Sequence, residues 1–238
     1  MPFDPFLPVP HHVVVIPDGN RRWARERGLA SWKGHEAGVE STEKILKKAK
    51  ELAIPCLSLW GSSLDNLTKR PLEEKLALLR IYEVNFAKLA ENEDIHEDKV
   101  RINFFGRWEE QLPGPVKKSI YRCREATKNY RQRQINFFLA YNGDDEMLQA
   151  VKGIAAQGLA PNQITFQTVK EHLMTKDLPP VDFLIRTGGE PHWSTGFMMW
   201  DVANAQLSFS ETYYPDFDGD AFEEAIGEFQ QRKRRHGE

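Results

Sequence analysis

The chain has 238 residues, of which 40% are hydrophobic and 28% charged, and its formal net charge is -3. A chain of this length can bury a substantial core. The slightly acidic balance excludes a global basic field that would draw the protein onto nucleic acid or an anionic membrane. We therefore expect no nucleic-acid partner, and the arginines must be interpreted where they cluster.

The cysteines and the apolar runs give the expected location of the protein. Cys56 and Cys123 form neither a CxxC pair nor a disulfide framework. Residues 1–12 contain four prolines and do not resemble a signal peptide. No apolar run approaches the roughly 20 residues of a transmembrane helix. We expect a cytoplasmic protein with at most a peripheral contact with a membrane surface.

Five apolar segments that end in glycine or small polar residues have the pattern of buried strands. They are residues 12–19, 56–63, 101–106, 135–144 and 181–190. Amphipathic helical stretches lie between them, which predicts an α/β fold with a mostly parallel central sheet that is flanked by helices and covered on both faces. No linker or repeat divides the chain. We therefore predict a single domain over residues 12–238 and an N-terminal extension over residues 1–11.

A predicted helix over residues 72–91 is apolar on more than one face. Its simplest interpretation is a helix that packs on the sheet or against a second subunit. The alternative interpretation is that one of its faces lines an apolar channel.

The first strand ends in Asp18 and runs into a segment crowded with arginine. Alone, this carboxylate would be interpreted as a helix cap or a turn former. Gly19 leaves room for the backbone to turn, and Arg22 lies close behind, a combination that favours an anion site. A carboxylate beside such a turn suits a divalent cation that bridges it to phosphate. Because Asn20 stands where aspartate-nucleophile phosphatases have a second aspartate, that class is disfavoured.

A second candidate anion site follows the last predicted strand. Arg186 and the paired glycines of "RTGGE" offer guanidinium and backbone donors. The alternative is a glycine-rich turn with a surface arginine. The chain contains neither a GxxxxGK[ST] nor a GxGxxG motif, so neither a Walker nor a Rossmann nucleotide site is expected.

Several motifs occur in a fixed order along the chain. They are "IPDGNRRWA", "GHEAG", "SSLDN" with "RP" close behind, "LIRTGGE" followed by a Trp-containing segment, "YYPDF", and a terminal "RRHG". Together they resemble the cis-prenyltransferases, the undecaprenyl diphosphate synthase family. The matches extend from about His12 to Gly237, and the first and last groups are the most specific.

The resemblance implies a homodimer of single α/β domains, each with a hydrophobic tunnel between sheet and helices for the growing isoprenoid. The family's essential aspartate, which holds Mg²⁺ against the allylic diphosphate, corresponds to Asp18. The positions that cradle the phosphates and the site histidine correspond to Gly19, Asn20, Arg21, Arg22, Trp23 and His35.

A second group of family positions lies in the loop that positions the substrates. Ser63 and Asn66 resemble the serine and asparagine of that loop, and Arg70 resembles the arginine before its proline. The general base that removes the C2 proton stays open between Asn66, a water molecule and the departing diphosphate.

The isopentenyl diphosphate half of the family's site is only partly matched. Arg186 and Ser194 resemble its ligands, and Arg235 and Gly237 resemble the C-terminal Arg-x-Gly that reaches the partner subunit's site. His192 replaces a common second arginine. The alignment places Gln206 where the family has a metal-binding glutamate, and an amide is a weaker ligand for Mg²⁺ than a carboxylate.

Other departures surround the same predicted pocket. Ser31 stands where many members carry an arginine for the allylic diphosphate, Leu67 replaces a loop tryptophan, and Asp144 replaces an arginine.

The resemblance implies a Mg²⁺-dependent prenyltransferase that condenses an allylic prenyl diphosphate with isopentenyl diphosphate into a cis-prenyl diphosphate of short to medium length. Two alternatives stay open: transfer to a different acceptor, and a non-catalytic subunit of a heteromeric enzyme. Five aromatic side chains are candidates for the tunnel floor that limits product length: Phe86, Phe104, Phe105, Phe137 and Phe138.

Overall fold

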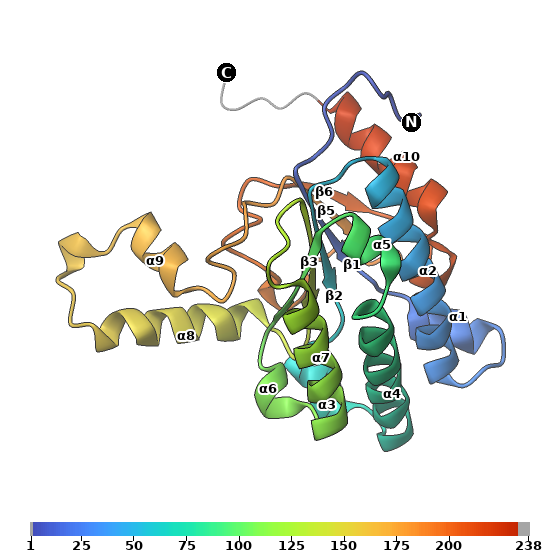
Figure 1. The fold of residues 1–238 in the computed structure, drawn as a ribbon, viewed down its shortest axis with the longest axis horizontal. Helices are drawn as coiled ribbons and strands as arrows, with labels where there is room; N and C mark the ends of the chain where they lie inside the picture. The colour runs from blue at the N-terminus through green and yellow to red at the C-terminus, as the bar shows by residue number, and fades with distance from the viewer. Residues whose placement is uncertain (1, 233–238) are drawn as a thin grey trace.

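The computed structural model describes residues 2–232, which form one layered α/β unit around a six-stranded sheet (Figure 1). Every strand pair is parallel, and the strand order is β3-β4-β2-β1-β5-β6. The strands are β1 (His12–Ile16), β2 (Cys56–Trp60), β3 (Val100–Phe105), β4 (Arg133–Phe138), β5 (Phe183–Arg186) and β6 (Gln206–Phe209).

Helices connect most of these strands. They are α1 (Asn20–Glu26), α2 (Ser31–Glu51), α3 (Leu64–Lys69), α4 (Leu72–Leu89), α5 (Glu93–Glu97), α6 (Trp108–Gln111), α7 (Gly114–Thr127), α8 (Gly143–Ala156), α9 (Phe166–His172) and α10 (Gly219–Gln231). The described residues also form three short 3-10 helices: η1 (Pro161–Gln163), η2 (Ser194–Gly196) and η3 (Tyr214–Asp216).

The predicted α/β fold with a parallel sheet is confirmed, and all five predicted strands are present. The sequence analysis missed β6. This four-residue strand lies at the edge of the sheet and only Ser208 is buried in it, so it lacks the continuous apolar run by which the other strands were recognised.

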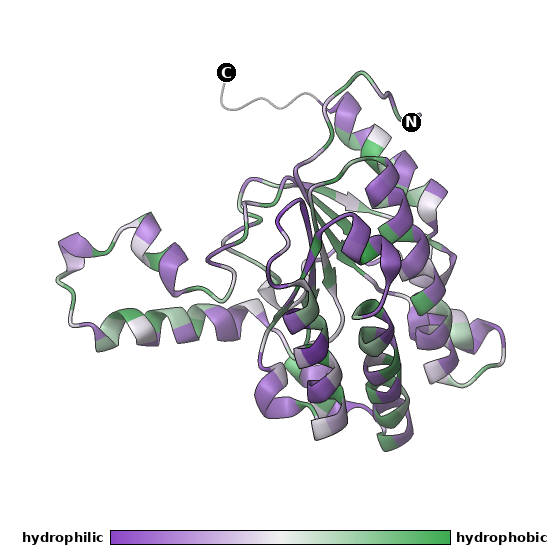
Figure 2. Cartoon of the chain, viewed as in Figure 1, coloured by the Kyte–Doolittle hydropathy of each residue, from purple (hydrophilic) through white to green (hydrophobic). Residues whose placement is uncertain are grey.

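The two faces of the sheet are covered differently. On one face, side chains such as Val13 and Val15 pack against α2, α4, α7 and α10. On the other face, Val14 and Ile16 belong to a cluster with residues of the largely irregular segments 178–181 and 197–202. In Figure 2 the strands between these layers are predominantly green, whereas the helices carry purple on their outer sides.

The carboxyl ends of the strands gather the polar residues that follow them. Ile16 of β1 pairs with Arg186 of β5, so Asp18 follows directly beside Arg186. On the other side of β1, Val15 pairs with Leu59 of β2, which brings Ser62 and Ser63 to the same edge. This is the edge at which open α/β sheets bind ligands.

Two segments lie away from the sheet core. Helices α8 and α9 project from the body as an arm, with α8 in contact with α9 and η2 (Figure 1). The N-terminal segment lies against α10, where the amide of Asp4 donates to Gln230 Oε1 over 2.9 Å. Within residues 2–232, no helix is long and apolar enough to cross a membrane.

His12 anchors β1 through a buried polar chain. Its Nδ1 lies 2.8 Å from the carbonyl oxygen of Pro179, which can only accept, so Nδ1 carries the hydrogen. Nε2 then accepts from the Ser58 hydroxyl at 2.8 Å, and Ser58 accepts from the Asn136 amide. Burial lowers the pKa of His12 from 6.5 to about 4, although Pro179 and Asp182 raise it in part.

This histidine makes stability depend on pH. Because its folded pKa lies below its unfolded value, its contribution is complete above pH 6.5 and is lost as the pH falls toward 4. We expect that loss to be about 3 kcal/mol. Urea unfolding at several pH values should show a correspondingly flatter dependence in His12→Gln, and parallel curves for the two proteins would contradict this assignment.

Candidate active site

Asp18 sits in a turn that its neighbours hold rigidly. Its backbone amide donates to Thr187 Oγ1 at 2.9 Å, and the Thr187 hydroxyl donates to the Asp18 carbonyl at 2.8 Å. Gly19 follows with φ +100°, and a Cβ there would lie 2.6 Å from the ring of Tyr213. Both the positive φ and the contact require glycine, so this residue fixes the direction of the carboxylate.

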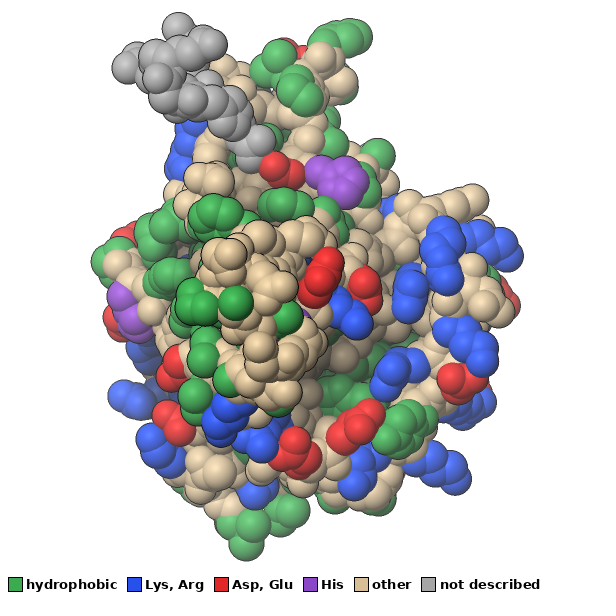
Figure 3. Space-filling model, turned by 90° about the vertical axis from the view of Figure 1, so that its left-hand side faces the viewer, with side chains coloured by type: hydrophobic (Ala, Val, Ile, Leu, Met, Phe, Trp, Pro, Cys, Tyr) green, Lys and Arg blue, Asp and Glu red, His purple; other side chains and the backbone are tan. Residues whose placement is uncertain are grey.

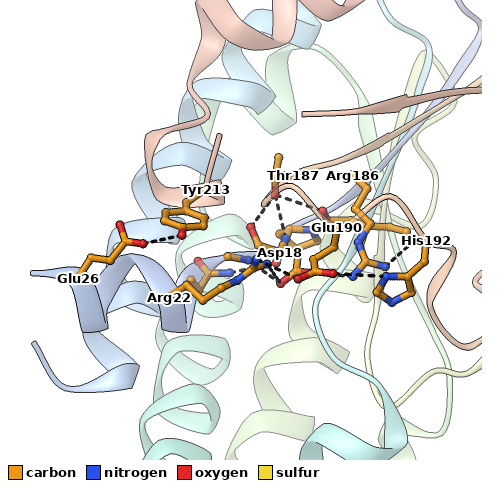
Figure 4. A network of polar contacts seen from close by, with 12 residues as sticks. Asp18, Arg22, Glu26, Arg186, Thr187, Glu190, His192 and Tyr213 are labelled. Carbon is orange, nitrogen blue, oxygen red and sulfur yellow. Dashed lines mark hydrogen bonds and ion pairs between the residues drawn. The ribbon is translucent and has the colours of Figure 1, made fainter. Parts of the chain in front are cut away.

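Two guanidinium groups flank the Asp18 carboxylate (Figure 4). Arg186 Nη2 lies 2.7 Å from Oδ2, and Arg22 Nη2 lies 3.3 Å from Oδ1. Arg22 also pairs with Glu190 at 3.1 Å, and Arg186 donates to the carbonyl of His192 at 2.7 Å. The side chain of Arg186 is only 5% exposed, so its position is set by packing as well as by charge.

A second ionic cluster lies beside the first and is centred on Glu74. Its carboxylate is 3% exposed and contacts Arg70 and His35, each at 3.3 Å, and Arg21 at 3.5 Å. Arg70 also donates to Asn66 Oδ1, which links α3 to α4. The carboxylate therefore aligns two arginines toward the same space.

His35 and Glu74, the two ionisable groups at the centre of this cluster, differ in charge: the imidazole is neutral and the carboxylate is ionised. Burial lowers the pKa of His35, with the hydrogen bond to Glu74 raising it in part, so the ring is neutral at pH 7. The hydrogen bond from His35 lowers the pKa of Glu74 below its usual range, against the effect of burial. Glu74 is thus the counter-ion of the arginines, and His35 is a hydrogen-bonding group.

Two glycines allow α2 to lie against the start of α1. A Cβ on Gly34 would meet the carbonyl oxygen of Asn20 at 1.9 Å, and one on Gly38 would meet Asn20 Oδ1 at 2.6 Å. The "GHEAG" motif is therefore a packing motif that also delivers His35 to the site.

These side chains surround a cavity of about 400 Å³. Five arginines line it, namely Arg21, Arg22, Arg25, Arg70 and Arg186, together with Pro17, Asp18, Gly19, Asn20, His35, Glu190 and His192. Cations outnumber carboxylates in the lining, and guanidinium groups bind phosphate oxygens with paired hydrogen bonds. The cavity is therefore suited to a diphosphate.

A larger cavity of about 830 Å³ lies on the helical face of the sheet, and Pro17 lines both cavities. Its apolar walls come from α2, α4, β2 and β4, through residues such as Leu46, Phe86, Leu59 and Phe137. The alternative interpretation of the helix at 72–91 is thus confirmed, because one face of α4 lines an apolar channel.

The candidate floor residues divide between different surroundings. Phe86 and Phe137 line the apolar cavity. Phe104 packs behind them, with its ring 4.8 Å from that of Phe86. Phe105 and Phe138 stack on each other on the opposite face of the sheet, so they do not limit this cavity.

Not every expected site residue reaches the cationic cavity. Trp23 instead donates to Asp216 at 2.7 Å and stacks under Arg27. Ser31 starts α2 and Ser194 starts η2, and neither contributes to the lining formed by the described residues. Ser63 accepts from the backbone amide of Asn66, so the pair forms the N-cap of α3.

Gln206 is not brought near Asp18 within one chain. It pairs with Phe183, which in turn pairs with Val13 of β1. Asp18 lies five residues beyond Val13, which corresponds to roughly 16 Å along extended strands. The predicted residues Arg235 and Gly237 lie outside the described part of the chain.

Sequence analysis missed Glu74 and Glu190 as site residues. Both pair with arginines that were predicted, Glu74 from the first turn of α4 and Glu190 from the end of "RTGGE". The spacing of Arg70 and Glu74, one residue before the N-cap of α4 and one in its first turn, was a usable signal.

A divalent cation at Asp18 would need further ligands from a bound substrate. Among the described residues, no group of three or more histidine, cysteine or acidic side chains is arranged to hold a metal. Asp18 offers one carboxylate, and its oxygens already contact Gly19, Arg22 and Arg186. Mg²⁺ commonly binds through one carboxylate with substrate phosphates and water, and the residues fit that mode.

The fold and this pair of cavities define a protein that binds an anionic head group at the carboxyl edge of a parallel sheet and an apolar tail beside it. Comparison with known proteins agrees. Residues 16–237 match the family model described as "Putative undecaprenyl diphosphate synthase". The chain belongs to this family, and it is a prenyltransferase.

Curated relatives cover almost the whole chain. A "Tritrans,polycis-undecaprenyl-diphosphate synthase (geranylgeranyl-diphosphate specific)" of Methanopyrus kandleri is 39% identical over 96% of this chain and 85% of its own length. An "Isoprenyl transferase" of Thermus thermophilus is 37% identical over 97% of this chain and 89% of its own length. A solved structure of lavandulyl diphosphate synthase from Lavandula x intermedia, in complex with dimethylallyl diphosphate, superposes with a TM-score of 0.88 at 28% identity. The match covers 97% of this chain and 99% of that chain.

The Glu74 cluster predicts a specific loss of stability. In Glu74→Gln, the partly buried Arg70 loses its buried counter-ion, so the free energy of unfolding should fall by about 3 kcal/mol. Urea denaturation of the variant would measure this. Glu73→Gln, an exposed change one residue earlier on α4, is the matched control. Equal unfolding midpoints for the two variants would show that Glu74 is not the organising charge.

Proposed function

We propose that this enzyme condenses an allylic prenyl diphosphate with isopentenyl diphosphate and yields a cis-prenyl diphosphate of short to medium length. The observation that carries the proposal is the junction at Pro17, where an arginine-lined cavity meets an apolar one. A prenyl diphosphate has the same division, with a charged head and a hydrocarbon tail. The relatives named above support the reaction class.

The side chains divide the chemical work between them. Arg22, Arg186 and Arg70 neutralise the diphosphate as the allylic C1–O bond breaks and the diphosphate leaves with the electron pair. A Mg²⁺ ion held through Asp18 would supply further charge stabilisation to that leaving group. The isopentenyl double bond attacks C1, and loss of a C2 proton sets the cis double bond.

Asn66 serves as a positioning residue in this scheme. Its amide nitrogen donates to Ser63 Oγ, and its amide oxygen accepts from Arg70. An amide whose oxygen already binds a guanidinium is a poor base. We therefore assign the C2 proton to water or to the departing diphosphate, and assign Asn66 to the orientation of Arg70.

The product length follows from where the apolar lining ends. At its far end the larger cavity is bordered by Lys50, which pairs with Asp94 at 3.0 Å and Asp98 at 2.8 Å. A hydrocarbon chain gains no burial beyond this charged border. This favours a short to medium product.

One observation favours a second candidate function, transfer to an acceptor other than isopentenyl diphosphate. His192 is 59% exposed and stands at the cavity rim, where the family commonly has an arginine. An imidazole lacks the paired donors of a guanidinium, so the rim would hold an acceptor diphosphate through fewer hydrogen bonds. The subunit alternative is disfavoured, because one chain assembles Asp18 with both of its arginines.

The product assay tests both candidates. Purified protein with Mg²⁺ receives labelled isopentenyl diphosphate and dimethylallyl, geranyl, farnesyl or geranylgeranyl diphosphate, and the products are weighed by mass spectrometry. We expect additions of five-carbon units, and a loss of about 100-fold or more in kcat/KM in Asp18→Ala. Glu125→Ala, which changes an exposed carboxylate of α7 paired with Lys128, is the control.

Other results of this assay separate the alternatives. Consumption of the allylic diphosphate without incorporation of label would refute isopentenyl diphosphate as the acceptor. Turnover that appears only after a partner protein is added would support the subunit alternative.

We further propose a cytoplasmic homodimer that joins through the α8–α9 arm. Leu148 and Val151 of α8 are 51% and 57% exposed, and Phe166 of α9 is 84% exposed. Figure 3, which views the molecule from the side on which the arm projects, shows apolar side chains grouped near the centre of this face. Burial of such a patch stabilises association. We also propose that the enzyme contacts the membrane surface transiently when it releases its lipophilic product, without a membrane anchor.

Light scattering after gel filtration tests the dimer. We expect the wild type to have the mass of two chains and Leu148→Glu to dissociate, because a charge would be buried in the interface. Leu76→Glu, an exposed leucine of α4, should stay dimeric. A monomeric wild type, or a dimeric Leu148→Glu, would contradict the proposed interface.

A further inference from the structure

Tyr82 places a buried hydroxyl group beside the junction of the two cavities. It lies in the middle of α4, lines the apolar cavity and is 7% exposed, with its ring 5.6 Å from that of Phe86. Its hydroxyl has no hydrogen-bond partner within the described part of the chain. A phenylalanine would fill the same space without a polar atom.

An unpaired buried hydroxyl is costly, because it loses its hydration without a replacement. Burial raises the pKa of Tyr82 to about 12, while the approach of the Ser62 hydroxyl as a hydrogen-bonding group and the charge of Arg70 lower it in part. The group therefore keeps its proton at neutral pH and is a hydrogen-bond donor. The approach of Ser62 falls short of hydrogen-bond geometry. The Ser62 oxygen already accepts from the amide of Ala140 at 3.1 Å.

The strand register places this donor next to the site. A Cβ added to Gly61 would lie 3.1 Å from the Tyr82 hydroxyl, so the hydroxyl touches the residue that follows β2. Val15 pairs with Leu59, and continuing that register sets Pro17 opposite Gly61. Pro17, Gly61 and Tyr82 all line the apolar cavity. The hydroxyl therefore lies on the cavity wall beside Gly61, the residue that this register sets opposite the one before Asp18.

A prenyl diphosphate that spans the two cavities must pass this point. Its diphosphate lies among the arginines, its hydrocarbon chain lies between α2 and α4, and Pro17 marks the passage. The bond that crosses the passage is the one between C1 and the diphosphate oxygen. We propose that Tyr82 is a substrate-binding residue whose hydroxyl donates a hydrogen bond to the bridging oxygen of the allylic diphosphate.

This hydrogen bond would act on the reaction as well as on binding. Negative charge grows on the bridging oxygen as the C1–O bond breaks, so a fixed donor there stabilises the departing group more than the bound substrate. The proton stays on Tyr82 throughout. The inference rests on the proposed function, because it needs an allylic diphosphate in the two cavities.

The test compares two ligands in two proteins. Farnesyl diphosphate and its S-thiolo analogue, in which sulfur replaces the bridging oxygen, are titrated calorimetrically into wild type and Tyr82→Phe without isopentenyl diphosphate. Sulfur is a weak acceptor. We expect Tyr82→Phe to weaken binding of the oxygen ligand about 3- to 10-fold, and to change binding of the sulfur ligand less than twofold.

Tyr214 provides the matched control. It is buried, lines the same cavity, and its hydroxyl is already hydrogen-bonded to Thr42 at 2.7 Å. Tyr214→Phe should lower the melting temperature and leave the ratio of the two affinities as in the wild type. Tyr82→Phe should have an unchanged or higher melting temperature, because it removes an unpaired polar group.

The outcomes separate the inference from the proposed function. Equal affinities of wild type and Tyr82→Phe for farnesyl diphosphate, or equal losses for both ligands, would overturn the role of the hydroxyl and leave the proposed function intact. No binding of either ligand by the wild type would overturn both.

Discussion

A carboxylate held between two guanidinium groups is the interaction on which the rest of the site depends. Asp18 is paired with Arg186 at 2.7 Å and with Arg22 at 3.3 Å, at the carboxyl ends of adjacent strands. This negative charge offsets the repulsion between the two arginines, and Glu190 and the His192 carbonyl help to hold them. The carboxylate thus holds two guanidinium groups in position. A diphosphate with Mg²⁺ can then bind to all three groups, with its oxygens on the two arginines and the metal on Asp18.

The fold makes this arrangement compatible with a hydrocarbon ligand. The sheet carries its large helices on one face, and α2 and α4 leave an apolar cavity of about 830 Å³ between them and the strands. That cavity reaches the same edge at which Asp18 lies. Charge is concentrated on one side of Pro17 and apolar surface on the other, so the site orients an amphipathic substrate before any chemistry occurs.

Sequence patterns predicted the parts of this design that are local. The β-branched run before Asp18, the glycine behind it and the arginines that follow identify the end of a strand and an anion site, and "RTGGE" identifies its neighbour. The short edge strand β6 was missed because its pattern is weak. The remoteness of Gln206 from Asp18 depends on strand register, which an aligned motif does not encode.

Long-range pairings were the other part that sequence alone did not predict. Glu74 was not singled out in the sequence, and only the structure places it among Arg21, His35 and Arg70. The unpaired hydroxyl of Tyr82 is likewise visible only when every neighbour is placed. In both cases the role of the side chain depends on neighbours that are distant in the sequence.

A crystal structure with Mg²⁺ and the unreactive farnesyl S-thiolodiphosphate tests the central claim most directly. The account predicts phosphate oxygens within hydrogen-bond distance of Arg22 and Arg186, metal density between Asp18 and the diphosphate, and the hydrocarbon chain between α2 and α4. A diphosphate bound elsewhere, or a chain that leaves the apolar cavity empty, would contradict it.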